Sequence, residues 1–233
     1  TFTKNLELDQ NYDGSFRFQS SGFQKSYDTN KYETLLINDF LFESNDYISN
    51  KGIKTNYDLL LKNFNSYSEN STSYKEKEDY EVFGTLLINT SLPLNKITKT
   101  GDDYLKPITS FRYSPNNTKN ISNKDKRLSY NNIFALNRIG TNEIVEGGRS
   151  LSIGFEYEKR NTNNQKILGF ALANSLRERS NDNLPSKTKL NEERTDLVGK
   201  FAFSPNKVLN FDYSFSYDNN LKNSNYDSVS TSI

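Results

Sequence analysis

The chain has 233 residues, of which 33% are hydrophobic and 13% aromatic, and its 30 basic and 29 acidic residues leave a net charge of +1. It contains no cysteine and no histidine, which excludes disulfides, thiolate or imidazole metal sites, and nucleophilic catalysis with a histidine base. The balanced charge argues against nucleic-acid binding, and no apolar run is long enough for a membrane-spanning helix.

Alternation of apolar and polar residues predicts β-strands along most of the chain. Two segments, 32–40 and 57–64, also fit a helical stripe, but their neighbours alternate and helix caps are missing, so we interpret both as strands. In chain order, the predicted strands cover residues 14–22, 32–40, 57–64, 80–92, 104–113, 150–158, 165–177, 194–204 and 208–218.

The alternation is strictest at 150–158 and 208–218, where one face of each strand is apolar and the other is polar. Because successive side chains of a strand point to opposite faces, each strand should present two chemically different surfaces. We expect the outward positions to be Leu151, Ile153, Phe155, Tyr157, Leu209, Phe211, Tyr213 and Phe215. We expect Glu156, Asn210 and Asp212 to point inward.

Long polar loops alternate with short turns between these strands. The predicted long loops are 66–79, 114–144 and 178–193, and the predicted short turns are 49–52, 161–164 and 205–206. This alternation predicts an all-β, antiparallel up-and-down sheet with the long loops at one end. Transmembrane β-barrels have the same asymmetry and similar strand lengths, so we expect about ten strands of a larger barrel. A soluble β-sandwich would also alternate, and remains the alternative at this point.

The segment 104–157 gives a more specific indication. It includes Asn137-Arg138-Ile139-Gly140 and, a few residues later, Glu146-Gly147-Gly148-Arg149. It resembles the C-terminal β-barrel of the lipopolysaccharide-assembly outer-membrane protein, the LptD (OstA) family, in its alphaproteobacterial form. The resemblance extends more loosely over 30–218. Where the family often has an Asp-Arg pair after the glycine, this chain has Thr141-Asn142-Glu143.

The resemblance implies a protein that places lipopolysaccharide in the outer leaflet of the bacterial outer membrane. The expected partners are lipopolysaccharide, outer-membrane lipid, a lipoprotein plug similar to LptE and the periplasmic transport bridge. Enzymatic activity, a cofactor, a metal and nucleic acid are not expected. The chain contains no methionine, which favours a piece of a longer or processed protein. We expect residues 1–233 to be part of one barrel domain, without a second domain.

The loop 114–144 carries too many apolar residues for a solvated linker, so we expect it to fold over or into the lumen as a lid. An arginine fork can bind phosphate or carboxylate in a bidentate way, although the same charges could simply tie the loop to the barrel wall. The lumen and lid candidates are Arg112, Tyr130, Asn132, Phe134, Asn137, Arg138, Glu143, Glu146 and Arg149. The expected structural glycines are Gly140, Gly147 and Gly148, and we expect the last two to form a bulge or bend.

Two other functions remain open on the sequence. The chain could belong to another outer-membrane barrel, such as a porin or an uptake receptor, which would conduct ions as an open pore. It could also be a secreted β-rich binding module, which would be extracted without detergent.

Overall fold

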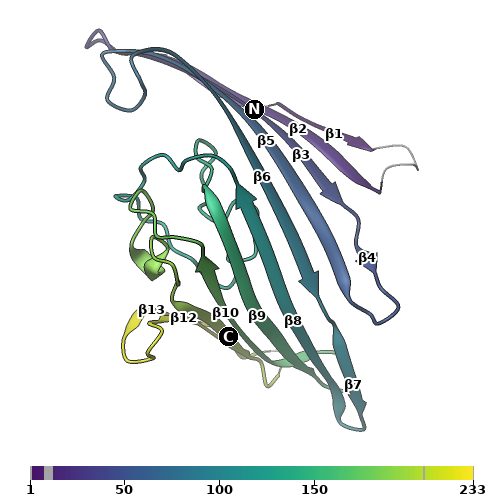
Figure 1. Ribbon diagram of the computed structural model, residues 1–233. Helices are drawn as coiled ribbons and strands as arrows, with labels where there is room; N and C mark the ends of the chain where they lie inside the picture. Colours follow the sequence, from purple (N-terminus) through teal and green to yellow (C-terminus); the bar gives the residue numbers. More distant parts are fainter. Residues whose placement is uncertain (1, 8–12, 207, 233) are drawn as a thin grey trace.

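The computed structural model describes residues 2–7, 13–206 and 208–232, which form one twisted and strongly curved antiparallel sheet (Figure 1). No helix in the described part of the chain is long and apolar enough to cross a membrane. The strands are β1 (Phe2–Glu7), β2 (Gly14–Ser26), β3 (Tyr32–Ser44), β4 (Tyr47–Ile48), β5 (Lys54–Glu69), β6 (Lys77–Ser91), β7 (Leu94–Thr98), β8 (Gly101–Ser114), β9 (Gly148–Arg160), β10 (Lys166–Arg177), β11 (Leu197–Phe203), β12 (Asn210–Tyr217) and β13 (Ser224–Ser232). A 3₁₀ turn, η1 (Lys187–Lys189), lies between β10 and β11.

The predicted all-β, up-and-down topology is confirmed. The strands pair in the order β1-β2-β3-β5-β6-β8-β9-β10-β11-β12-β13, while the short β4 pairs with β5 and β7 with β8. The thirteen described strands exceed the expected ten or so, because β1 and β13 were not predicted and β4 and β7 are short. The edge strands β1 and β13 do not pair with each other, so the described sheet is open.

The long loops lie at one end of the sheet, as predicted. Antiparallel pairing places the connections 70–76, 115–147 and 178–196 at that end, and the turns 49–53 and 161–165 at the other. The first of these loops is shorter than the expected 66–79, since β5 continues to Glu69 and β6 begins at Lys77.

The two faces of the sheet differ as the alternation predicted. Ser150 and Ser152 on β9 accept hydrogen bonds from Arg138 of the loop on the concave side. Since side chains alternate along a strand, Leu151 and Ile153 lie on the convex side. Ile153 is 51% exposed. On β12, Ser216 likewise bonds to Asp196 on the concave side. The expected facing is therefore confirmed for the positions within β9 and β12, while Leu209 lies just before β12.

The convex face carries many large exposed apolar side chains. On neighbouring strands these include Leu36, Phe40, Tyr57, Leu59, Leu61, Tyr80, Val82, Phe111 and Ile153. A soluble monomer rarely exposes so continuous an apolar surface. No second sheet covers this face within the described residues, which argues against the sandwich.

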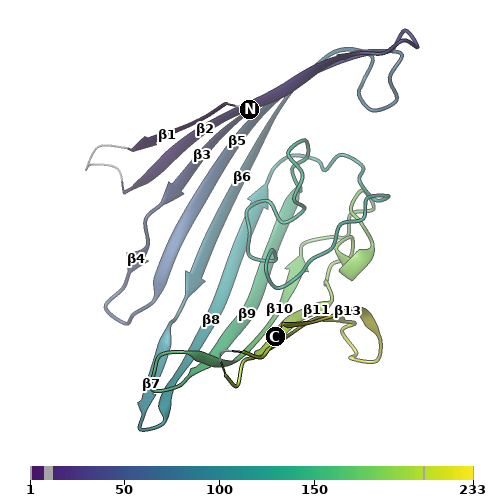
Figure 2. The same ribbon diagram turned by 180° about the vertical axis from the view of Figure 1, so that it is seen from behind.

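The long loops 115–147 and 178–196 lie over the concave side of the sheet (Figure 2). Most of the buried apolar residues form two clusters between these loops and the sheet. One cluster joins loop residues to the inner faces of β10 and β11, and it consists of Ile121, Leu128, Tyr130, Ile133, Ile139, Ala171, Ala173, Leu184, Leu190 and Val198. A second cluster consists of Leu35, Ile37, Phe64, Phe83 and Val145. Each fully buried Leu, Ile or Phe contributes about 1.5–3 kcal/mol. The loop 115–147 therefore folds against the inner wall, as its apolar content predicted.

Pro107 lies inside β8, where a proline would normally interrupt pairing. It is tolerated because the neighbouring strand is interrupted at the same level, between β6 and β7. The N–H of Leu92 in that interruption donates to the carbonyl oxygen of Pro107 at 3.1 Å.

Candidate functional site

The loop 115–147 is fixed to the wall by a buried arginine–carboxylate pair. Arg138 donates from Nε to Oε2 of Glu146 at 2.7 Å and from Nη2 to Oε1 at 2.6 Å. Arg138 also donates to the Oγ atoms of Ser175 at 2.8 Å and Ser150 at 3.0 Å. Each partner of the pair has a side chain only 1% exposed. The pair thus joins the loop to β9 and β10.

Two arginines of the wall complete this cluster. Arg177 on β10 donates to Oε1 of Glu146, and to the carbonyl oxygen of Gly147 at 3.1 Å. Arg112 on β8 donates to the carbonyl oxygens of Glu146 at 2.5 Å and Leu136 at 3.1 Å. Three guanidinium groups therefore surround one buried carboxylate. We call Arg112, Arg138, Glu146 and Arg177 the latch cluster.

The charge of Glu146 is fixed by its arginines. Burial alone would raise the pKa of this carboxyl group, but the charges of Arg138 and Arg112, with the hydrogen bond from Arg138, outweigh it and hold the pKa well below its usual range. Within the cluster, three cations face one anion, which leaves two positive charges unmatched. Buried charge of this kind is costly unless it is paired, so the single carboxylate is essential to the arrangement.

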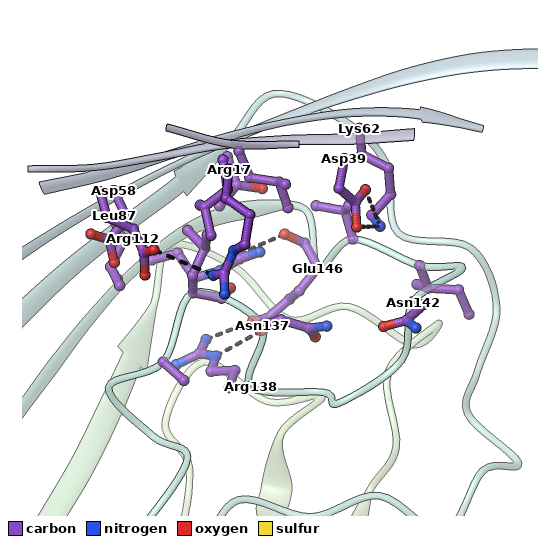
Figure 3. Close-up of a pocket in the computed structure, with 18 of the residues that line it drawn as sticks. Arg17, Asp39, Asp58, Lys62, Leu87, Arg112, Asn137, Arg138, Asn142 and Glu146 are labelled. Atoms are coloured by element: carbon purple, nitrogen blue, oxygen red, sulfur yellow. Dashed lines mark hydrogen bonds and ion pairs between the residues drawn. The ribbon is translucent and has the colours of Figure 1, made fainter. Parts of the chain in front are cut away.

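A polar cavity of about 450 Å³ separates the latch cluster from strands β2, β3 and β5. Figure 3 shows Asp39 and Lys62 on these strands, opposite Glu146 and Asn142 of the loop. Lys62 pairs with Asp39 at 2.6 Å, and Arg17 also lines the cavity. The cavity offers hydrogen bonds and charges of both signs, and can accommodate hydrated or anionic groups.

Tyr130 and Phe134 anchor the same loop through apolar contacts. Their rings meet edge-on at a centroid distance of 5.7 Å, and both pack in the cluster on β10 and β11. The ammonium of Lys200 on β11 lies 4.8 Å from the ring centroid of Tyr130. These two aromatic residues therefore help to position the loop, and Phe134 lines the same cavity as Arg138 and Glu146.

Asn132 and Asn137 shape the loop backbone. Asn132 accepts a hydrogen bond from the N–H of Ser129 at 2.8 Å, and Asn137 accepts one from the N–H of Gly140 at 3.0 Å. Asn137 also donates to the carbonyl oxygen of Thr141 at 2.8 Å. The φ angle of Gly140 is +68°, a conformation that favours glycine.

Glu143 and Arg149 lie outside the latch cluster. Glu143 is exposed and accepts a hydrogen bond from the hydroxyl of Tyr74 at 3.4 Å. Burial and the nearby charge of Glu143 raise the pKa of Tyr74 to about 12. Arg149 is also exposed and lies 3.6 Å from Glu178. Of the predicted charged residues, the structure thus brings Arg112, Arg138 and Glu146 together. Glu143 and Arg149 lie apart from these three.

Gly147 and Gly148 were expected to form a bulge or bend, and no bulge occurs here, since β8 and β9 pair in regular register up to Ser114 and Gly148. Instead, Gly147 permits a close approach of two backbone segments. A Cβ atom at this position would lie 1.9 Å from the carbonyl oxygen of Asn116. Gly148 has a φ angle of +91°, which also favours glycine.

Replacing Gly147 with alanine is therefore expected to lower the free energy of unfolding by about 1–3 kcal/mol, the usual cost of forcing atoms into a packed site. The measurement is urea unfolding in detergent, followed by circular dichroism. Gly84→Ala is the matched control, because a Cβ there has no atom within 4 Å. Equal stability of the Gly147→Ala variant and the wild type would show that residues 116–118 move away freely.

Arg177 was missed by sequence reasoning, although a signal existed. It lies at the end of the predicted strand 165–177, with the same parity as Ala173 and Ser175, both of which are buried on the concave side. A charged residue at an inward position next to a long loop indicates a partner from that loop. The identity of the partner, Glu146, could not be inferred from spacing alone.

The depressed pKa of Glu146 predicts a pH dependence of loop stability. Since the folded state holds the pKa below the ordinary carboxyl value of 4.5, the stabilisation is fully present above that value and is lost as pH falls below it. Hydrogen exchange of amides 130–138 should therefore differ between wild type and Glu146→Gln by a constant amount from pH 7 to about 5. The difference should shrink at lower pH. A difference that already disappears above pH 5 would contradict the charged, paired state of Glu146.

A comparison with protein-family models matches this chain. The family model described as LPS transport system D matches residues 2–233. A comparison with curated proteins found no match.

Proposed function

Because the chain belongs to the LPS transport system D family, we propose that it forms part of a barrel that inserts lipopolysaccharide into the outer leaflet of the bacterial outer membrane. The observation that carries this proposal is the family match, which extends over the whole of residues 2–233. Transport of lipopolysaccharide is the function of the family. That this barrel itself inserts the lipopolysaccharide is our proposal.

The two faces of the sheet support this function in physical terms. Lipopolysaccharide has an apolar lipid part and a polar, anionic sugar part. The convex face exposes residues such as Leu61 and Val82, which suit contact with lipid tails. The concave side holds a polar cavity lined by groups such as Arg17 and Asp39, which suit hydrated sugars.

We further propose that residues 1–233 belong to one barrel domain, with a lipoprotein plug similar to LptE and the periplasmic bridge as partners. The inner surface of β2 and β3 supports a partner inside the barrel, because it is polar and incompletely covered. The side chains of Arg17 and Glu43, which pair at 3.3 Å, are 42% and 46% exposed. Crosslinking from these two positions in cells would test the plug.

The loop 115–147 is the lid of this barrel in our proposal. It is held by the latch cluster on one side and by Leu128, Tyr130 and Ile133 on the other. The lid would close the lumen between delivery events, so the resting barrel would conduct ions poorly.

The direct test is conditional depletion of the intact protein in the bacterium that makes it. Newly made lipopolysaccharide at the cell surface is measured by surface labelling, and uptake of a small hydrophilic solute is measured in parallel. Depletion should lower the surface lipopolysaccharide. Unchanged surface lipopolysaccharide with reduced solute uptake would contradict the proposal and favour a porin.

A further inference from the structure

A second polar pocket opens at the loop end of the sheet, separate from the cavity beside β2, β3 and β5. Its volume is about 600 Å³. Three segments form it, namely 116–118 and 147–149 at the two ends of the loop 115–147, and 177–183 at the start of the loop 178–196. We call it the rim pocket.

The rim pocket presents two exposed arginines, Arg149 and Arg179. The side chain of Arg149 is 58% exposed, and its guanidinium lies 3.6 Å from the equally exposed Glu178. Such an exposed pair contributes little and can exchange partners. Arg179 is exposed and has no ion-pair or hydrogen-bond partner among the described residues.

The inner side of the rim pocket is formed in part by Arg177, a member of the latch cluster with its two unmatched positive charges. The side chain of Arg177 is only 3% exposed, and its Nε has no hydrogen-bond acceptor among the described residues. An anion in the pocket would lie next to this excess charge. Charge–charge interactions at such a partly buried position are less screened than at the open surface.

The rest of the pocket is polar and fixed in position. Asn181 donates to Oγ1 of Thr118 at 3.2 Å, and Asn183 donates to the carbonyl oxygen of Thr118 at 3.1 Å. Gly147 donates its N–H to the same Oγ1 at 2.8 Å. These bonds join loops 115–147 and 178–196 around the pocket, so the arginines stand on a preformed rim. Its lining also holds the carboxylates of Glu178 and Asp182, so three arginines face two carboxylates and the rim keeps a positive excess.

We propose that the rim pocket binds a saccharide through a phosphate or carboxylate group that the saccharide carries. Arginine forks match the geometry of phosphate and carboxylate oxygens, and the asparagine-rich rim suits sugar hydroxyls. This inference rests on the proposed function. In that function the sugar part of lipopolysaccharide would emerge at the loop end of the sheet, where the rim pocket lies.

The test is calorimetric titration of the intact protein in detergent with glucose 6-phosphate, alongside glucose and inorganic phosphate. Glucose 6-phosphate should bind, and glucose should not. The double variant Arg149→Gln/Arg179→Gln should weaken binding by about tenfold or more, equivalent to about 1.4 kcal/mol. Arg127→Gln, in the same loop but outside the rim pocket, is the matched control and should bind like the wild type.

Absence of glucose 6-phosphate binding, or equal affinity of the double variant, would overturn the proposal. Equal affinity for inorganic phosphate and glucose 6-phosphate would overturn its saccharide part and assign the pocket to a free anion. Both replaced arginines are exposed, so folding should be preserved, and circular dichroism checks this. Binding is measured without transport, so its failure is distinct from a failure to deliver lipopolysaccharide to the cell surface.

Discussion

Replacing Glu146 with glutamine is expected to release the loop 115–147 from the inner wall and to lower the free energy of unfolding by about 3–5 kcal/mol. The substitution keeps the shape of the side chain but removes the single negative charge of the latch cluster. Arg112, Arg138 and Arg177 would then be buried without a counter-charge. Urea unfolding in detergent measures the loss, and hydrogen exchange of amides 130–138 shows whether the loop is released.

The matched control for this variant is Glu143→Gln in the same loop. Glu143 is exposed and forms a single long hydrogen bond, from Tyr74, so its replacement should change stability by no more than about 0.5 kcal/mol. A Glu146→Gln variant as stable as this control would show that the buried arginines do not depend on the carboxylate. The double-mutant cycle of Glu146→Gln with Arg138→Gln should show strong coupling between the two residues.

Deleting residues 128–140, with a short glycine-serine link in their place, is expected to open the lumen and to impair outer-membrane assembly. The deletion removes Leu128, Tyr130, Ile133 and Ile139, which hold the loop on β10 and β11, together with Arg138 of the latch cluster. Each buried Leu or Ile contributes about 1.5–3 kcal/mol, so the remaining loop should leave the wall. Ion conductance in planar bilayers should rise, and cells should become sensitive to large hydrophilic antibiotics.

A matched control replaces residues 162–164, in the turn between β9 and β10 at the opposite end of the sheet, with the same glycine-serine link. This variant should conduct like the wild type. Unchanged conductance after deletion of 128–140 would show that the loop does not obstruct the lumen.

The strands were predictable where a local pattern determines them. Strict alternation at 150–158 and 208–218 identified β9 and β12 and the facing of their side chains, because a two-residue period places each parity on one face. The strand β13 lacks that pattern. Its sequence is almost entirely polar, and its position is determined by backbone pairing with β12, which no local property of residues 224–232 indicates.

The site was predictable only in part, for a similar reason. The apolar residues of the loop 114–144 indicated that it packs against the wall, and Arg138 and Glu146 were among the charged candidates that the sequence suggested in or beside this loop. Their assembly with Arg112 and Arg177 depends on contacts between β8, the loop and β10, and Glu146 is 31 residues from Arg177 in the chain. The close approach of Gly147 to Asn116 likewise depends on how the two ends of the loop meet.

Photo-crosslinking in living cells tests most directly whether lipopolysaccharide passes along the concave side of this sheet. A photoreactive residue is placed at Asn142, which lines the cavity beside the latch cluster, or at Ile153, which is exposed on the convex face. We predict lipopolysaccharide adducts at position 142 that disappear soon after lipopolysaccharide synthesis is stopped, and adducts at 153 that persist because that face contacts the membrane. Absence of adducts at 142 during active synthesis, with normal adducts at 153, would contradict the proposed route.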